Sequence, residues 1–492
     1  MPVAENRMTA MDAAFLYLER SGQRFHVASV VTTDGPVDFE PLVADLDAKL
    51  HLIPRYKQRP AQVPFGLGHP TWDPDPTFDI RNHMIRHRLR GAGDEGQLVE
   101  LASRLFAQEL DLRRPLWELH VIDNYAGGRS ALVAKVHHCM IDGISGVQLM
   151  AVMFDPSPHP APPPPPTDQD RLPAPPLPTP AVRVWRAVQE NVMNRARTVQ
   201  AVFEQLRRDP TAVVGEASEL LESAGELWRY LVMPVPKTPW NGHVSILRRL
   251  VWTTFPLHDV KAVKNRLGGT VNDVVLATIS GALRAYLEAR GVNPDRIELR
   301  AACPVSTRAS SEHLKLGNRV SAMMAPLPVG ILDATERYRQ VRIGMAQLKQ
   351  KGESKHIERM LDLMAGLPAA IQRNLAWVQT SAMPVNTICT NLPGPPVSLY
   401  VQGQRIERIV PVVPLTQGIG LAFAIMSYAD TLTIGVPCDP ALVPDADDLP
   451  GRLQQAFDEL AQLAGVERAA ERITPLRPER LRRVERDAHQ VA

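Results

Sequence analysis

Two adjacent histidines, His137 and His138, precede an aspartate, Asp142, and a glycine, Gly143. An imidazole is the side chain that takes up and releases a proton most readily near neutral pH. A carboxylate a few residues away can turn back toward that ring or pair with a cation that fixes the loop. These residue types at this spacing predict a general base with a structural support. A second glycine, Gly146, favours the turn that would bring them together.

The element that must position these groups is the apolar run 131–136, which we expect to form a buried strand ending at the histidines. Successive side chains of a strand point to opposite faces, so the two histidines cannot enter the same pocket. Positions 132, 134 and 136 would share a face with His138, and Lys135 would share the other face with His137. The pattern alone does not say which face is reactive.

Other uses of these residues stay open. A metal site would need a further His or Glu at ligand spacing, and adjacent strand histidines chelate poorly, so we predict no metal here. A hydrogen-bonded pair of core histidines is the plainer alternative. We predict that the neighbouring Cys139 is a small buried filler, because base catalysis does not need a thiol at this position.

The chain has 492 residues, enough for two or more domains, and its 45% hydrophobic and 22% charged content is ordinary for a globular protein. A net charge of +2 supplies no bulk electrostatic argument for nucleic acid, and the chain has neither a basic run interleaved with aromatics nor a recognisable nucleic-acid-binding motif, so we expect no nucleic-acid partner. No apolar stretch has the length of a transmembrane helix, and residues 1–8 show no signal-peptide pattern. We therefore expect a cytoplasmic protein, and four widely spaced cysteines without a CxxC pair fit a reducing compartment.

Composition divides the chain into five segments. The proline-rich stretch 156–182 cannot form helix or sheet ladders, because so many of its residues lack an amide donor, and we expect an extended linker. It separates a first lobe, 1–155, from a helical connector, 183–236, and a second lobe, 237–465, which an arginine-rich tail, 466–492, follows. Both lobes show a similar order of helices and strands, which predicts a mixed α/β fold with several antiparallel strands.

The connector is predicted to begin with an amphipathic helix, and a second helix is expected around 219–232. The apolar residues of the first helix recur at three- and four-residue steps with one longer gap, and arginines mark its opposite side. Two interpretations fit: a helical pair packed on the globule, or an amphipathic surface that touches lipid. The apolar stripe consists of Trp185, Val188, Val192, Val199, Phe203 and Leu206.

A long helix from about 271 to 290 places Asn272 and Asp273 in its first turn. Short polar side chains there can satisfy free backbone amides or meet a ligand, and N-capping explains at least one of them. Strands are predicted at 299–305, 386–390, 406–413, 420–428 and 431–436, before a last amphipathic helix.

Residues 137–143, HHCMIDG, match HHxxxDG, the signature of the CoA-dependent acyltransferase superfamily that includes chloramphenicol acetyltransferase and peptide-synthetase condensation domains. Further blocks occur in the right order, and over residues 8–465 the chain resembles the bacterial bifunctional wax ester synthase/diacylglycerol acyltransferase family. These blocks are MTAMDAAFLYLE at 8–19, Pro115-Leu116-Trp117, TPWNG at 238–242, Asn272-Asp273, PVS at 304–306 with Arg308, Gly317-Asn318 and NLPGP at 391–395.

The resemblance implies two chloramphenicol-acetyltransferase-like lobes with the active site in a tunnel at their interface. It makes His138 the general base and Asp142 a structural residue paired with an arginine, for which Arg308 is our candidate. The oxyanion donors would be backbone amides near Gly143 or the side chain of Asn272. The implied catalytic set is His137, His138, Asp142, Gly143 and Asn272, and the substrate-binding set is Pro115, Leu116, Trp117, Asp273, Ser306 and Arg308. Leu116 and Trp117 fit either an apolar channel or core packing.

The implied reaction moves a long-chain acyl group from acyl-CoA to diacylglycerol or a fatty alcohol, with no cofactor besides acyl-CoA as a substrate. A product as insoluble as a wax ester or triacylglycerol must leave into lipid, so we expect peripheral association with the inner membrane or lipid droplets. Two alternatives remain. One is an acyltransferase of the same superfamily with a carrier-protein donor. The other is a non-catalytic lipid-droplet protein, against which the intact His138 and Asp142 argue.

Overall fold

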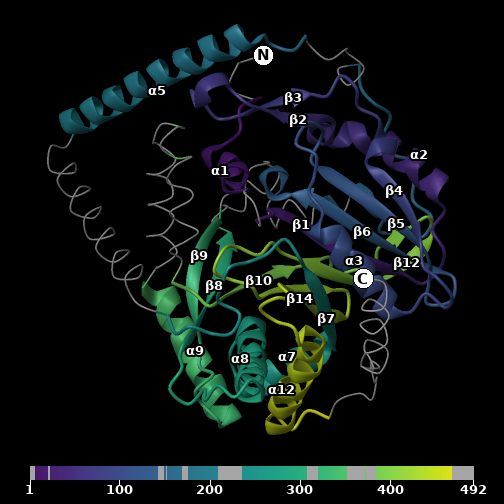
Figure 1. The fold of residues 1–492 in the computed structure, drawn as a ribbon, viewed down its shortest axis with the longest axis vertical. Coiled ribbons are helices and arrows are strands. Elements are labelled where there is room, and N and C mark those ends of the chain that lie inside the picture. Colours follow the sequence, from purple (N-terminus) through teal and green to yellow (C-terminus); the bar gives the residue numbers. More distant parts are fainter. Residues whose placement is uncertain are drawn as a thin grey trace, which may run out of the picture.

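The computed structural model describes residues 6–19, 23–141, 149–168 apart from 151, 176–208, 235–306, 320–351 and 384–467, with the single positions 369 and 372. In these ranges the chain forms two six-stranded sheets, one in each half of the molecule, and a separate two-stranded hairpin (Figure 1). The predicted helix at 219–232 and the turn that holds Asp142 and Gly143 lie outside the described residues.

The first sheet has the strand order β11-β12-β1-β6-β5-β4. The neighbouring strands β5 and β6 form the hairpin that leads to the two histidines. Gly127 and Gly128, both at positive φ, make the turn between them. The strands are β1 (His26–Thr33), β4 (Met84–Arg88), β5 (Trp117–Tyr125), β6 (Arg129–His137), β11 (Tyr400–Val401) and β12 (Gln404–Val412).

Both faces of the first sheet are buried. Helix α2 (Phe39–Lys49) packs on the face formed by Leu132, Val136 and their neighbours. Helix α3 (Glu95–Ala107) packs on the face of Val133, between this sheet and strand β7 of the second one. The continuous apolar run predicted for β6 follows from this double burial.

The second sheet has the order β7-β14-β13-β10-β8-β9, and helices cover its outer face (Figure 1). A capping box between Thr270 and Asp273 begins the longest of these helices, α8. The strands are β7 (Arg249–Pro256), β8 (Leu299–Ser306), β9 (Val320–Leu327), β10 (Thr387–Pro393), β13 (Ala422–Tyr428) and β14 (Thr431–Cys438). The helices are α7 (Leu257–Leu267), α8 (Val271–Ala289), α9 (Ala334–Lys351) and α12 (Leu449–Leu463).

Strand β12 departs from the sequence-based assignment of residues 237–465 to one lobe, because it pairs antiparallel with β1 inside the first sheet. Its apolar residues explain this position. Ile406 and Ile409 enter one core of the first sheet, whereas Val410 enters the core on the other face, so the strand needs burial on both sides. The two sheets also approach closely, since a Cβ on Gly435 of β14 would lie 2.0 Å from the carbonyl oxygen of Pro411.

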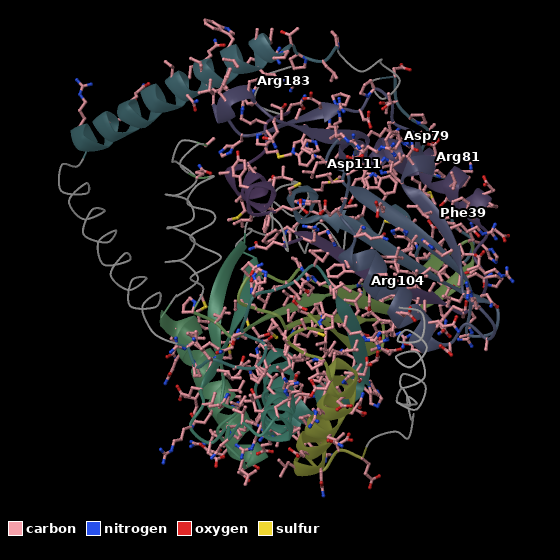
Figure 2. All side chains as sticks on the ribbon, in the orientation of Figure 1. Phe39, Asp79, Arg81, Arg104, Asp111 and Arg183 are labelled. Carbon is pink, nitrogen blue, oxygen red and sulfur yellow. The ribbon has the colours of Figure 1, made fainter. Side chains whose placement is uncertain are left out.

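Helix α5 (Pro180–Arg208) lies across the outer side of the first lobe, beside the hairpin of β2 (Gln58–Ala61) and β3 (Thr71–Pro74) (Figure 1). Arg183 anchors its N-terminal part through an ion pair with Asp73, close to the hairpin in Figure 2. No helix in the described part of the chain is long and apolar enough to cross a membrane. The remaining helical elements are α1 (Ala10–Leu18), η2 (Leu50–Leu52), η3 (Pro54–Lys57), η4 (Pro64–Gly66), η5 (Ile80–Asn82), η6 (His138–Met140) and η8 (Ala446–Asp448).

Candidate active site

His137 ends strand β6 and is completely buried. Its Nδ1 accepts a 3.1 Å hydrogen bond from the backbone N–H of Cys139, so the ring proton belongs on Nε2. Nε2 lies 3.0 Å from Oε2 of Glu19, which follows helix α1. Both ring nitrogens are therefore engaged inside the protein, and His137 fixes the end of the strand against α1.

His138 begins the short helix η6 and is only partly buried. Its ring stacks on Phe15 of α1 with 4.1 Å between ring centroids and 19° between ring planes. Its backbone N–H donates a 2.7 Å hydrogen bond to the carbonyl of Phe25. The structure thus separates the two histidines as a strand requires, and His138 is the one of the two that is not fully buried.

A charged network lies on the opposite face of the same strands. Lys135 is fully buried and donates to the carbonyl oxygens of Leu105 and Gln108 at 3.1 and 3.2 Å. Its Nζ also lies 2.7 Å from Oε2 of Glu118. Burial alone would raise the pKa of Glu118, but the hydrogen bond from His120 and the Lys135 charge hold that pKa at about 2. The network ties β5 and β6 to helix α3 and keeps the strand ends rigid.

His26, opposite His137 on β1, belongs to the same buried face. Burial, with the nearby Lys135 charge, lowers the pKa of His26 from 6.5 to about 3, so this ring is neutral at physiological pH. In the described residues, no group of three or more His, Cys, Asp or Glu side chains is arranged to hold a metal ion.

The second lobe contributes Asn272, in the first turn of α8 and partly exposed. Its Oδ1 accepts a 3.2 Å hydrogen bond from Nδ2 of Asn391 on β10. The neighbouring Asp273, expected from the sequence to meet the substrate, uses its carboxylate to accept hydrogen bonds from the backbone N–H and the hydroxyl of Thr270 at 2.7 and 2.8 Å. Asp273 therefore stabilises the helix end that presents Asn272.

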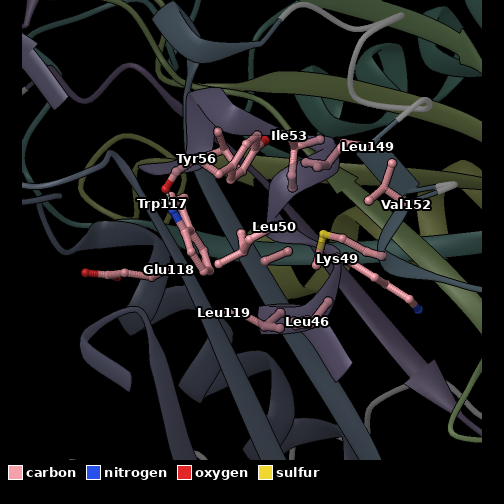
Figure 3. A pocket seen from close by; sticks show the side chains of 13 residues that line it. Leu46, Lys49, Leu50, Ile53, Tyr56, Trp117, Glu118, Leu119, Leu149 and Val152 are labelled. Carbon is pink, nitrogen blue, oxygen red and sulfur yellow. Dashed lines mark hydrogen bonds between the residues drawn. The ribbon is translucent and has the colours of Figure 1, made fainter. Parts of the chain in front are cut away.

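Of the Pro115-Leu116-Trp117 block, Trp117 lines a narrow apolar pocket on the α2 side of the first sheet (Figure 3). The cavity between its walls measures only about 30 Å³. Leu116 is completely buried and Pro115 is buried beside it. The other residues lining the pocket are Leu46, Lys49, Leu50, Ile53, Tyr56, Glu118, Leu119, Ala134, Val136, Leu149, Val152 and Met153.

Several predicted site residues cannot be placed against this geometry. Asp142, Gly143 and Arg308 lie outside the described residues, as does the side chain of Ser306, whose backbone ends β8 opposite Val320. Four residues of the site were not singled out from the sequence as functional: Phe15, Glu19, Tyr56 and Asn391. Phe15, Glu19 and Asn391 stand inside blocks that carried the family resemblance. Tyr56 lies in a basic turn without any such signal.

Models of the wax ester synthase/diacylglycerol acyltransferase catalytic domain and of the C-terminal domain of that family match residues 8–275 and 316–461. The probable diacylglycerol O-acyltransferase tgs1 of Mycobacterium tuberculosis is 32% identical over 467 residues, which cover 93% of this chain and 96% of that protein. A putative diacylglycerol O-acyltransferase of Mycobacterium bovis is similar to the same extent, with 32% identity over 467 residues and the same coverage, 93% and 96%.

Two solved structures share the fold. The wax ester synthase/diacylglycerol acyltransferase from Marinobacter aquaeolei VT8 has a TM-score of 0.65 at 24% identity and covers 94% of this chain and 100% of that one. The first condensation domain of the calcium-dependent antibiotic synthetase has a TM-score of 0.57 at 15% identity and covers 96% and 100%. These likenesses confirm the predicted two-lobed mixed α/β fold.

Proposed function

The chain belongs to the wax ester synthase/diacylglycerol acyltransferase family, and we propose that it transfers a long-chain acyl group from acyl-CoA to diacylglycerol or a fatty alcohol, with His138 as general base. One observation carries the choice of base. Both ring nitrogens of His137 are bonded in a fully buried environment, whereas His138 leaves the strand on the other side and is only partly buried.

The proton balance of the reaction requires one such base. An alcohol hydroxyl is a weak nucleophile at neutral pH, so His138 removes its proton as the oxygen attacks the thioester carbon. The tetrahedral intermediate then collapses, the carbon–sulfur bond breaks, and the same proton passes to the departing CoA thiolate. No covalent enzyme intermediate and no redox step is needed, so we propose no cofactor besides the acyl-CoA substrate.

The negative oxygen of the tetrahedral intermediate needs positioned donors. Asn272 suits this task, because Asn391 occupies its amide oxygen and thereby directs the amide NH₂ group the other way. The backbone amides near Gly143 remain our second candidate. Donors from both lobes around one carbonyl would make the reaction depend on the assembled interface.

We also propose that α5 touches a lipid surface. Arg183, Ala187 and Asn191, at four-residue steps, face the first lobe: Arg183 pairs with Asp73, Ala187 is buried, and Asn191 donates to the carbonyl of Leu67 at 2.8 Å. Trp185 and Val192, on the opposite side of the helix, are 67% and 62% exposed. A helix that turns its small and polar side to the protein and its apolar side outward fits an interfacial helix.

A neighbouring loop extends this apolar surface. Phe65 belongs to η4, which contacts α5, and its side chain is 88% exposed. Its backbone has a φ of 59°, a conformation that residues other than glycine rarely adopt. An exposed apolar ring on an element that contacts α5 supports a membrane or lipid-droplet contact at which an insoluble product could leave.

The proposed function is tested by supplying purified protein with palmitoyl-CoA and either hexadecanol or dipalmitoylglycerol, and identifying the ester product by chromatography. We expect hexadecyl palmitate or tripalmitoylglycerol together with one free thiol per ester. A parallel reaction with palmitoyl-carrier protein separates the remaining alternative. Product from the carrier protein alone would contradict acyl-CoA as the donor.

A further inference from the structure

We propose that the groove between helix α1 and the segment that contains η4 holds the hydrocarbon chain of the acyl acceptor. The inference rests on the proposed function and deepens it, because it names the surface along which the acceptor arrives from lipid. We call this feature the α1 groove. Its lining residues in the described part of the chain are Leu16, Tyr17, Glu19, Gln62, Val63, Pro64, Phe65 and Gly66.

The α1 groove has room for a long alkyl chain. Its volume is about 680 Å³, within the range of about 300–1,000 Å³ that is usual for ligand sites. The pocket beside Trp117, in contrast, measures only about 30 Å³. The groove is open to solvent, and apolar side chains from two elements form much of its walls, with Leu16 on one side and Val63 on the other. Such walls bind an alkyl chain through burial of apolar surface.

The groove reaches the residues that hold the two histidines. Glu19 lines it, and Oε2 of the same residue lies 3.0 Å from Nε2 of His137. Phe15, four residues earlier, stacks on the ring of His138. Helix α1 also packs on η6, the short helix that begins with His138. A chain that lies against α1 therefore ends beside the proposed base.

The opposite wall belongs to the proposed lipid contact. Phe65 lines the groove, and its side chain is 88% exposed. Its element, η4, contacts α5, whose residues Trp185 and Val192 point away from the protein. The groove thus connects an element proposed to touch lipid with the helix that holds His138. An acceptor that is insoluble in water could follow it without crossing bulk solvent.

The charge of the lining favours the acceptor over the CoA part of the donor. Glu19, the charged residue among the described lining residues, is acidic. Tyr17 leads to His69, whose Nδ1 lies 3.0 Å from the tyrosine hydroxyl. Burial, with the nearby charge of Arg7, lowers the pKa of His69 to about 4, so this ring is neutral at physiological pH. Arg7 itself is paired with Glu190. The phosphates of CoA would meet a carboxylate here, whereas a fatty alcohol and diacylglycerol carry no charge.

The first test fills the groove from each wall in turn, with palmitoyl-CoA as the donor. Leu16→Trp acts from α1, and Gln62→Trp acts from the opposite wall at an exposed position. We expect both variants to lower the ratio of kcat/KM for hexadecanol to that for butanol about tenfold, the effect of about two methylene groups left in water. Leu332→Trp, at a 75% exposed position of the second lobe, is the control and should keep the wild-type ratio. A wild-type ratio in Gln62→Trp would overturn the proposal.

The second test asks which substrate occupies the groove. Gln62→Lys and Gln62→Glu differ by two charges at one position. Because the acceptor is uncharged, we expect the two variants to share one KM for palmitoyl-CoA, even at low ionic strength, where charges act over the longest distances. A KM for palmitoyl-CoA that is severalfold lower in Gln62→Lys than in Gln62→Glu would place CoA in the groove and overturn the assignment.

The two alcohols also separate the groove from the proposed function. Butanol is too short to need the groove, so the wild-type protein should form an ester with it by the same chemistry as with hexadecanol. No ester from either alcohol in wild type rejects the proposed function and the groove together. Ester formation in wild type, with the same ratio of the two alcohols in Gln62→Trp, rejects the groove alone.

Discussion

Asn391 on β10 donates a 3.2 Å hydrogen bond from Nδ2 to Oδ1 of Asn272 in the first turn of α8. The bond fixes which end of the Asn272 amide is free to donate. It therefore connects a residue of the NLPGP block to the proposed oxyanion site. The relationship makes the role of Asn272 testable through a neighbour that need not touch the substrate.

We predict that Asn391→Asp lowers kcat nearly as much as Asn272→Ala, for which the loss of one oxyanion donor would give about 10²- to 10³-fold. A carboxylate at position 391 can only accept, so it would draw the NH₂ group of Asn272 toward itself. Steady-state rates with palmitoyl-CoA measure both effects. Asn391→Gln is the control that keeps a donor. Wild-type kcat in Asn391→Asp would argue against the oriented amide.

The contact between Glu19 and His137 predicts a stability effect. Glu19→Ala leaves the buried Nε2–H of His137 without its acceptor, which should lower the free energy of unfolding by about 1–3 kcal/mol. Glu19→Gln retains an acceptor oxygen and should lie close to wild type. Urea unfolding of the three proteins measures the difference. If Glu19→Ala unfolds at the wild-type urea concentration, the contact does not hold the strand end.

Acid should destabilise the protein below about pH 6.5, in part through His26. The folded protein holds the pKa of His26 at about 3, so between pH 6.5 and 3 the unfolded chain binds a proton that the folded protein excludes. Stability is therefore lost as the pH falls. From pH 7 to pH 5 this one group should remove about 2 kcal/mol of unfolding free energy. His26→Gln keeps a donor for the Phe106 carbonyl and should show a smaller loss in urea unfolding at the two pH values. An equal loss in both proteins would assign the pH dependence to other groups.

The outward side of α5 predicts lipid binding. Replacing Trp185, Val188 and Val192 together by serine should abolish co-flotation with phosphatidylglycerol vesicles, because these residues supply exposed apolar area. Gln189→Ser changes an exposed polar position of the same helix and serves as the control. Undiminished flotation of the triple variant would show that α5 is not the lipid contact.

Local patterns in the sequence predicted much of the first lobe correctly. The strand leading to His138 depends on nearby residues, and the structure has it as β6. The capping of α8 by Thr270 is local as well. The pairing of β12 with β1 could not be predicted from local patterns, because it joins residues such as Val30 and Val410, which are 380 positions apart.

The side chains around the site also divide into those that local sequence patterns predict and those whose positions depend on distant segments. Alternation along β6 required His137 and His138 to diverge, but Glu19, which engages His137, comes from a distant segment. The pocket beside Trp117 forms only when α2, β5, β6 and the segment near Leu149 meet. For α5, the periodicity gave the apolar stripe, whereas the contacts of Arg183 and Ala187 determine that its described members Trp185, Val188 and Val192 face outward. The side chains of Val199, Phe203 and Leu206 lie outside the described residues.

The central claim is that His138 supplies the base and His137 supports the strand end. The most direct measurement is the initial rate of thiol release from palmitoyl-CoA with hexadecanol, for wild type, His138→Ala and His137→Gln, each first checked for the wild-type fold by circular dichroism. We predict that His138→Ala loses about 10²- to 10⁴-fold in rate and that His137→Gln loses much less. Equal rates for wild type and His138→Ala, with His137→Gln the more damaged variant, would contradict the account.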